Sequence, residues 1–160
     1  MPAAAAAHSD EAGRLHGAVA DTNEHITVAA SREALAGTFP GYLGIELVEL
    51  TDDTVRGRMN VDQRHLHPGG YVHGGCWVAF ADTVAAWGTM RHLPPQRGFT
   101  TAELKTNVLA AGRPGDELEA VGELLHGGSR TQVWEVRVYR AEEDDGRRLM
   151  ANFLCTQMVL

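Results

Sequence analysis

The chain has 160 residues, of which 44% are hydrophobic and 22% are charged, a composition typical of one globular domain with a buried core. Its formal net charge of -7 argues against a nucleic-acid groove or an anionic membrane surface as the main partner. Cys76 and Cys155 lie too far apart for a metal-ligand pair or a disulfide framework, which favours a reducing, cytoplasmic location. We expect neither a secretory signal nor a membrane span.

The first part of the chain predicts a loose extension, a short helix and a hairpin. Residues 1 to 25 mix small and charged residues without apolar periodicity, so we place the domain at residues 26 to 160. Ser31 is the expected cap of the short helix. Strands are predicted at residues 43 to 50 and 54 to 61, because apolar and polar residues alternate on either side of a Thr-Asp-Asp turn.

The second part predicts one long helix followed by strands. A loop rich in His, Pro and Gly leads into a helix from about residue 74 to 92, which a Pro-Pro pair ends. Four further strands are expected, at residues 98 to 110, 117 to 125, 131 to 141 and 149 to 160. The plan is α+β, and a helix that is apolar on most faces requires a curved antiparallel sheet wrapped around it. The remaining edges and helix face predict a homodimer at least.

Asp82 is the most informative residue of the long helix. It is the only charged residue between Tyr71 and Met90. An unpaired carboxylate in a dry interior costs far more than packing returns, so such a residue is paired, exposed in a cleft or functional. The structural alternative is a carboxylate paired with the backbone or a threonine at a dimer interface. We favour function and take Asp82 as the candidate catalytic carboxylate.

The same helix begins with two glycines that suit an oxyanion. The N–H groups of Gly74 and Gly75 lack intrahelical partners, lie at the positive end of the helix dipole and carry no Cβ to hinder a ligand. Asp82 lies eight residues further on, which is roughly 12 Å along the axis. One carbonyl cannot contact both groups in one subunit. Two antiparallel helices across a twofold axis would instead give two shared sites per dimer.

Three segments carry a resemblance to a known family. The run from His67 to Gly75, the Ala-Asp-Thr around Asp82 and the segment beginning at Thr101 closely resemble the hotdog-fold acyl-CoA thioesterases, in the phenylacetate-degradation and 4-hydroxybenzoyl-CoA thioesterase-like branch. The resemblance covers most of residues 40 to 160. It implies a hotdog fold, hydrolysis of an acyl-CoA to free acid and coenzyme A, a homotetramer built from dimers, and no metal or other cofactor.

The resemblance also implies roles for single residues. Asp82 would be the nucleophile or general base, the Gly74 amide would polarise the carbonyl, and Thr101 would orient the attacking water. His67 stands where these enzymes usually carry Asn or Gln as a second donor to the thioester oxygen, and a neutral imidazole can donate one hydrogen bond. We expect His73 to hold the loop by a hydrogen bond and to take no part in the chemistry.

Further residues are implied as contacts of the substrate. The turn at residues 126 to 130 resembles the family's phosphate-contacting turn, which makes Ser129 and Arg130 candidates for the nucleotide half of coenzyme A. Arg113 is another candidate for the same role. Gly75 is expected beside the thioester carbonyl, and His73 is also counted among the substrate-binding residues.

Other functions stay open from the residues alone. A histidine about fifteen residues before an acid also resembles the hydroxyacyl-thioester dehydratases, with His67 and Asp82 as the acid and base. A non-catalytic acyl-CoA-binding module would keep the cleft and lose the chemistry. His65, His67 and His73 have a spacing that can converge on zinc or iron, although the expected carboxylate after them is missing.

Overall fold

A computed structural model gives the fold of residues 26–141 and 146–160. The predicted N-terminal extension, residues 1 to 25, lies outside the described residues. The helices, in chain order, are α1 (Val28–Leu35), α2 (Phe39–Tyr42), the 3-10 turn η1 (Gln63–His65) and α3 (Gly74–Arg91). The strands are β1 (Glu46–Leu50), β2 (Thr54–Asn60), β3 (Phe99–Val108), β4 (Glu117–Gly127), β5 (Thr131–Ala141) and β6 (Arg147–Val159).

Helix α1 begins earlier than predicted. Its N-cap is Thr27, whose hydroxyl accepts a hydrogen bond from the Ala30 N–H at 3.1 Å. Ser31 is therefore not the cap; it is buried inside the helix and its hydroxyl donates to the Val28 carbonyl at 2.8 Å. The prediction was wrong because Thr27 is an equally suitable capping residue one turn upstream.

The first hairpin forms as predicted, but β1 starts three residues late. Leu43 and Ile45 donate their backbone N–H groups to carbonyls of α2, those of Phe39 and Pro40, at 3.1 and 3.2 Å. Because these two N–H groups bond to the short helix, they do not pair with β2, and β1 starts only at Glu46. Helix α2 was not predicted, although its Pro40 lies in the first helical turn, where proline is tolerated.

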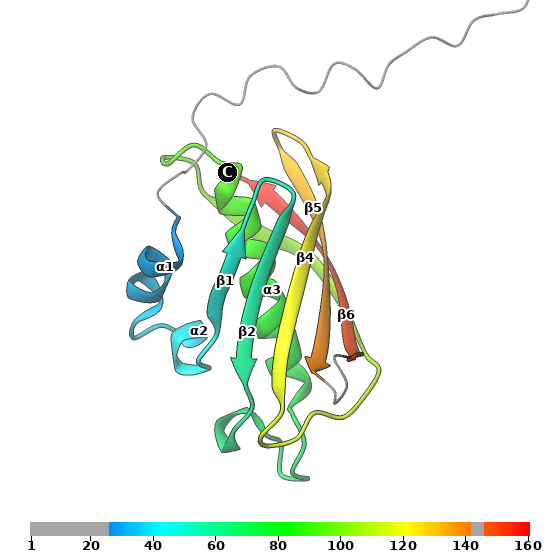
Figure 1. Cartoon of the computed structure of the whole chain (residues 1–160). Helices are drawn as coiled ribbons and strands as arrows, with labels where there is room; N and C mark the ends of the chain where they lie inside the picture. Colours follow the sequence, from blue (N-terminus) through cyan, green and yellow to red (C-terminus); the bar gives the residue numbers. More distant parts are fainter. Residues whose placement is uncertain (1–25, 142–145) are drawn as a thin grey trace, which may run out of the picture.

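The long helix and the sheet follow the predicted plan closely. The strands pair in the order β1-β2-β4-β5-β6-β3, and every pair is antiparallel. Helix α3 contacts all six strands and lies along the inner side of the curved sheet (Figure 1). Gly88 allows this close approach, since a Cβ there would lie 2.4 Å from the Trp134 ring. The predicted α+β architecture is confirmed.

The two edges of the sheet are β1 and β3. Strand β3 bonds only to β6 within the described chain, and its side chains are mostly exposed, including Leu104 at 41% and Val108 at 48%. An open edge with exposed apolar side chains is a surface that another strand can join. None of the described helices is long and apolar enough to cross a membrane.

Candidate active site

Asp82 lies on the part of α3 that faces β3 and β6. The Thr101 hydroxyl donates to Asp82 Oδ1 at 3.0 Å, and Gln157 Nε2 donates to the same oxygen at 3.5 Å. The carboxylate is half-buried, so it is neither sealed in the core nor fully solvated. The structure thus brings two predicted site residues, Asp82 and Thr101, into direct contact within one subunit.

Gln157 was missed by the sequence interpretation. It lies on β6, is 0% exposed, and pairs in register with Thr101 on β3. A signal was present, because Phe153 and Cys155 occupy the preceding inward-facing positions and a glutamine in that phase interrupts an apolar face. The same reasoning that singled out Asp82 in an apolar helix would have found it.

The start of α3 presents one free backbone donor. His73 is the N-cap, and its Nδ1 accepts from the Gly75 N–H at 2.9 Å, while the His73 carbonyl accepts from the Cys76 N–H at 2.9 Å. Within residues 26–141 and 146–160, no group accepts a hydrogen bond from the Gly74 N–H. The Gly74 N–H is therefore available to a ligand, whereas the N–H of Gly75 is already used by the cap. His73 holds the loop, which is the role expected for it.

His67 lies in the loop ahead of α3 with a defined tautomer. Its Nδ1 accepts from the Gly69 N–H at 2.9 Å. A neutral imidazole that accepts at Nδ1 carries its proton on Nε2, so Nε2 is a hydrogen-bond donor. The ring lines a cavity of about 350 Å³ together with Tyr71, Trp77 and residues 108 to 111. The structure thus leaves one N–H donor of His67 beside this cavity.

The three-histidine metal alternative does not match the geometry. His65 is 2% exposed, its Nδ1 accepts from the Asp62 N–H at 2.8 Å, and its Nε2 lies 2.8 Å from the Leu43 carbonyl. Both ring nitrogens are therefore held by the main chain and neither is free for a metal. No group of three or more His, Cys, Asp or Glu side chains that could hold a metal occurs among the described residues.

The candidate phosphate contacts lie at opposite ends of the subunit. The Arg113 guanidinium stacks over the Tyr71 ring at 5.1 Å, beside the start of α3. Ser129 and Arg130 occupy the exposed turn between β4 and β5, where the Arg130 carbonyl accepts from the Val159 N–H at 2.9 Å. In Figure 1 this turn is at the end of the molecule that holds the C-terminus, and the loop before β4 is at the other end. One subunit does not bring them together.

Neither cysteine is placed to act as a nucleophile. Burial raises the pKa of the Cys76 thiol to about 11, and burial together with the nearby charge of Asp82 raises the pKa of Cys155 to about 11. A thiol with such a pKa is almost entirely protonated at neutral pH, and the thiolate is the reactive form.

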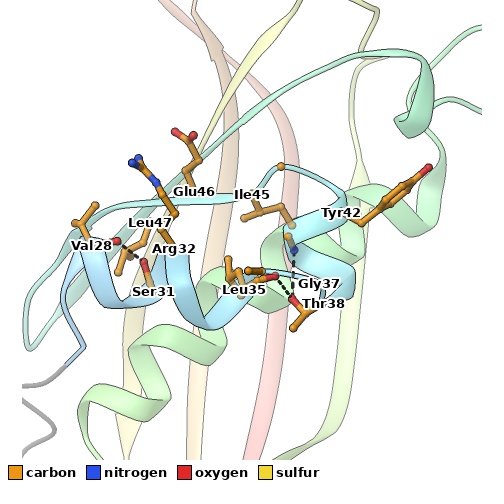
Figure 2. A pocket seen from close by; sticks show the side chains of 13 residues that line it. Val28, Ser31, Arg32, Leu35, Gly37, Thr38, Tyr42, Ile45, Glu46 and Leu47 are labelled. Atoms are coloured by element: carbon orange, nitrogen blue, oxygen red, sulfur yellow. Dashed lines mark hydrogen bonds between the residues drawn. The ribbon is translucent and has the colours of Figure 1, made fainter.

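A larger cavity lies elsewhere. A groove of about 510 Å³ runs between α1, α2 and the start of β1 (Figure 2). The hydroxyls of Ser31 and Thr38 face this groove, but they donate to the backbone carbonyls of Val28 and Leu35. None of the predicted site residues lines it, and the hydroxyl protons of Ser31 and Thr38 are already used by backbone carbonyls.

Comparisons with known proteins identify the family of the chain. The model of the thioesterase superfamily matches residues 69–146. The proofreading thioesterase EntH of Cronobacter turicensis is 30% identical over 135 residues, which cover 84% of this chain and 96% of that protein. The 1,4-dihydroxy-2-naphthoyl-CoA hydrolase of Escherichia coli is 28% identical over 134 residues, covering 84% of this chain and 96% of that protein. A thioesterase structure from Haemophilus influenzae superposes with a TM-score of 0.78 at 24% identity, covering 87% of this chain and 94% of that one.

The comparisons confirm the resemblance seen in the sequence. The matched segment contains the start of α3, Asp82 and Thr101, the same groups that the structure presents as a donor and a held carboxylate. The predicted hotdog fold, a long helix wrapped by an antiparallel sheet, is confirmed by the solved structure it matches. The chain belongs to the thioesterase superfamily and is a thioester hydrolase.

Proposed function

We propose that the protein hydrolyses an acyl-CoA thioester to the free acid and coenzyme A, with Asp82 as nucleophile or general base. The observation that carries the proposal is the half-buried Asp82 carboxylate, whose Oδ1 receives hydrogen bonds from Thr101 and Gln157. A carboxylate held in this way has a defined orientation toward a reactant. The relative from Escherichia coli, named for an acyl-CoA substrate, supports the acyl-CoA class.

The carbonyl is polarised by the start of α3. The free Gly74 N–H, at the positive end of the helix dipole, donates to the thioester oxygen, and His67 Nε2 is the second donor. These donors act most strongly on the negative charge that develops as the carbonyl carbon becomes tetrahedral. Binding the transition state more tightly than the ground state is what lowers the barrier.

Two routes give the same products. In the first, Asp82 takes a proton from water, the hydroxide oxygen bonds to the carbonyl carbon, and the carbon–sulfur bond breaks to release the coenzyme A thiolate. In the second, Asp82 attacks the carbonyl carbon and expels the thiolate, and water then cleaves the resulting anhydride. Both routes use only water and the side chains named, so we propose that the enzyme works without a metal or other cofactor.

The complete site needs a second copy of the chain. Gly74 and Asp82 are eight residues apart on one helix, which separates them by roughly 12 Å, whereas a reacting carbonyl needs both groups within about 3 Å. A dimer with antiparallel α3 helices brings Gly74 of one subunit to Asp82 of the other. The open edge of β3, with Leu104 and Val108 exposed, supports strand pairing between the copies.

The same arrangement accounts for the separated phosphate candidates. Antiparallel helices place the start of α3 of one subunit beside the middle of the partner's α3, and the loop ahead of that start beside the C-terminal half of the partner's α3. Arg113 of one subunit and the turn carrying Ser129 and Arg130 of the other would then border one nucleotide site. We propose further that dimers associate into a homotetramer, and that the enzyme is cytoplasmic, in line with its two free, buried thiols.

The first experiment measures release of free coenzyme A from a panel of aryl and aliphatic acyl-CoA esters. Asp82→Asn should lower kcat by about 10²- to 10⁴-fold on the best substrate, because a general base or nucleophile is removed. Circular dichroism and size-exclusion chromatography establish that the variant is folded and has the native oligomeric state. A folded Asp82→Asn protein with native kcat would show that another group carries the chemistry.

A mixing experiment tests the shared site. Asp82→Asn and Gly74→Pro each remove one half of the site, so each homodimer should be inactive. A mixed dimer contains one site with both lesions and one with neither, and random mixing should restore about a quarter of native activity. Absence of any recovery in co-expressed, verified mixed dimers would place both halves of the site in one subunit.

A further inference from the structure

Two buried glutamines lie side by side beneath α3. Gln132 on β5 and Gln157 on β6 are paired in register, and they are 2% and 0% exposed. Burying a carboxamide is costly unless its donors and acceptor are hydrogen-bonded. The two carboxamides bond to different neighbours: that of Gln132 bonds to the core and that of Gln157 bonds to the candidate site.

Gln132 bonds to the core through its carboxamide oxygen. Its Oε1 accepts from Trp134 Nε1 at 3.2 Å, so it provides the partner that a buried indole N–H requires. The carboxamide of Gln157 bonds instead to residues of the candidate site. Its Nε2 donates to Asp82 Oδ1 and to Cys155 Sγ, each at 3.5 Å, and its Oε1 accepts from the Thr101 hydroxyl at 3.1 Å.

The hydrogen bonds to Asp82 distinguish its two oxygens. Oδ1 receives both the Thr101 hydroxyl and the Gln157 amide. Among the described residues, none donates a hydrogen bond to Oδ2. The carboxylate is thus held by one oxygen, while the other remains available to water or to a thioester carbon.

Thr101 alone cannot hold Oδ1 continuously. Its hydroxyl has one proton and two acceptors within reach, Asp82 Oδ1 at 3.0 Å and Gln157 Oε1 at 3.1 Å. When that proton turns toward Gln157, the Gln157 N–H is the remaining donor to Oδ1. The carboxamide therefore orients both partners, because its oxygen positions the hydroxyl and its nitrogen positions the carboxylate.

We propose that Gln157 is a positioning residue for the hydrolytic reaction, which holds Asp82 through Oδ1 together with Thr101 and thereby makes Oδ2 the reacting oxygen. The proposal rests on the catalytic role of Asp82 given above. Carboxylate torsions are broad and roughly two-fold, so a carboxylate that loses one restraint samples unproductive rotations. Misplacement of a reacting group by about 1 Å can cost about a hundredfold in rate.

The neighbouring glutamine provides a matched control. Gln157→Met and Gln132→Met make the same chemical change at paired, equally buried positions, and only the first touches Asp82 and Thr101. Gln157→Met should lower kcat about ten- to a hundredfold with KM within about twofold. Gln132→Met should leave kcat within about threefold, although both should lower the melting temperature, since each leaves buried polar partners unsatisfied.

A double variant tests whether Gln157 acts only through Asp82. Asp82→Asn with Gln157→Met should be no slower than Asp82→Asn alone, because a positioning residue acts only through the group that it positions. Native kcat in Gln157→Met, beside a large loss in Asp82→Asn, overturns the inference and leaves the proposed function intact. Native kcat in Asp82→Asn itself overturns the proposed function.

Folding of the variants is checked independently. If Gln157→Met does not fold, Gln157→Leu places a second apolar side chain of similar volume at the same position, and the same loss of kcat is expected. Equal losses of kcat in the Gln132 and Gln157 variants would mean that both act only through the packing of the sheet, which contradicts the proposal.

Discussion

The two ends of the candidate site are built in opposite ways. The oxyanion end is mostly local: the side-chain hydrogen bonds of His67 to Gly69 and of His73 to Gly75 each span two residues of sequence, and one backbone hydrogen bond, from the Val72 N–H to the Gly112 carbonyl at 3.0 Å, connects this loop to a distant segment. The carboxylate end is assembled from α3, β3 and β6, with hydrogen-bonded partners 19 and 75 residues from Asp82. A local motif keeps its geometry if the loop forms, whereas the carboxylate depends on the packing of the whole sheet. Substitutions at the two ends should therefore differ in their effects on activity and stability.

Apart from Asp82→Asn, the largest effect is expected from deleting the backbone donor at the oxyanion end. Gly74→Pro removes the N–H at the first helical position, where proline fits a helix, and the ψ of 141° at His73 suits a residue before proline. We expect kcat to fall about 10²- to 10³-fold, the usual loss of one oxyanion donor. Thermal stability should change little, because no protein hydrogen bond from this N–H occurs in the described part of the chain.

Gly74→Ala is the control for this variant. It keeps the N–H, and its Cβ would meet nothing within 4 Å in the subunit. The ratio of kcat for the alanine and proline variants measures the contribution of the donor apart from added bulk. Equal activities in the two variants would contradict the oxyanion role of this amide.

At the carboxylate end, Thr101→Val should lower kcat about tenfold or more, because it removes a hydrogen bond to a charged group. Thr106→Val is the control on the same strand. The Thr106 hydroxyl is buried without a hydrogen-bond partner among the described residues, so its loss should leave kcat unchanged and should not reduce stability. Steady-state kinetics and melting curves of the pair distinguish a site role for Thr101 from a general effect of valine in β3.

A smaller effect is expected at His67. His67→Phe removes the Nε2 donor and should reduce kcat by severalfold up to about tenfold, the value of one neutral hydrogen bond. His67→Gln restores an amide donor of similar reach and should retain most of the activity. If the two variants were equally impaired, the imidazole would contribute something other than a hydrogen bond to the oxygen.

The smallest effect concerns the thiols, one at each end of the site. Cys76 and Cys155 should not react with an aromatic disulfide reagent in the native protein near pH 8, and the reagent should leave kcat unchanged.

The pKa values of the two thiols rise on folding from 9.0 to about 11, so the unfolded chain loses these protons first. Their contribution to stability is complete below pH 9 and is lost as the pH rises toward 11. Denaturant unfolding at pH 8, 9 and 10.5 measures this loss, and rapid native labelling would contradict the burial of the thiols.

The two His-Gly-Gly segments show how far the local sequence decides. After His73 the chain continues into apolar helix formers, and the glycines open α3. After His126 it continues into β5, and Gly128 donates its N–H to the Thr131 carbonyl at 2.9 Å in a hairpin turn. The same three residues form two structures, and the segments that follow distinguish them. The sequence predicted a helix start near residue 74 and a turn at residues 126 to 130; the structure confirms the helix start and confines the turn to residues 128 to 130, because His126 and Gly127 end β4.

Other details lay beyond local pattern. Residues 43 to 45 donate their backbone N–H groups to α2, and Thr27 rather than Ser31 caps α1. In both cases two local structures are nearly equivalent, so the local sequence does not decide between them. Gln157 became part of the site only because antiparallel pairing places it beside Thr101. A period of two predicts which residues face inward, but not which strand lies next to which.

By itself the sequence determined the α+β plan, the long helix, the glycines at its start and the isolated Asp82, because hydrophobic periodicity and turn chemistry act over a few residues. Only the tertiary structure decided that β3 lies beside β6 and that Thr101 and Gln157 hold one oxygen of Asp82. Contacts between residues distant in sequence depend on how strands pair around the helix. That pairing is set by burial of the whole core and not by any one segment.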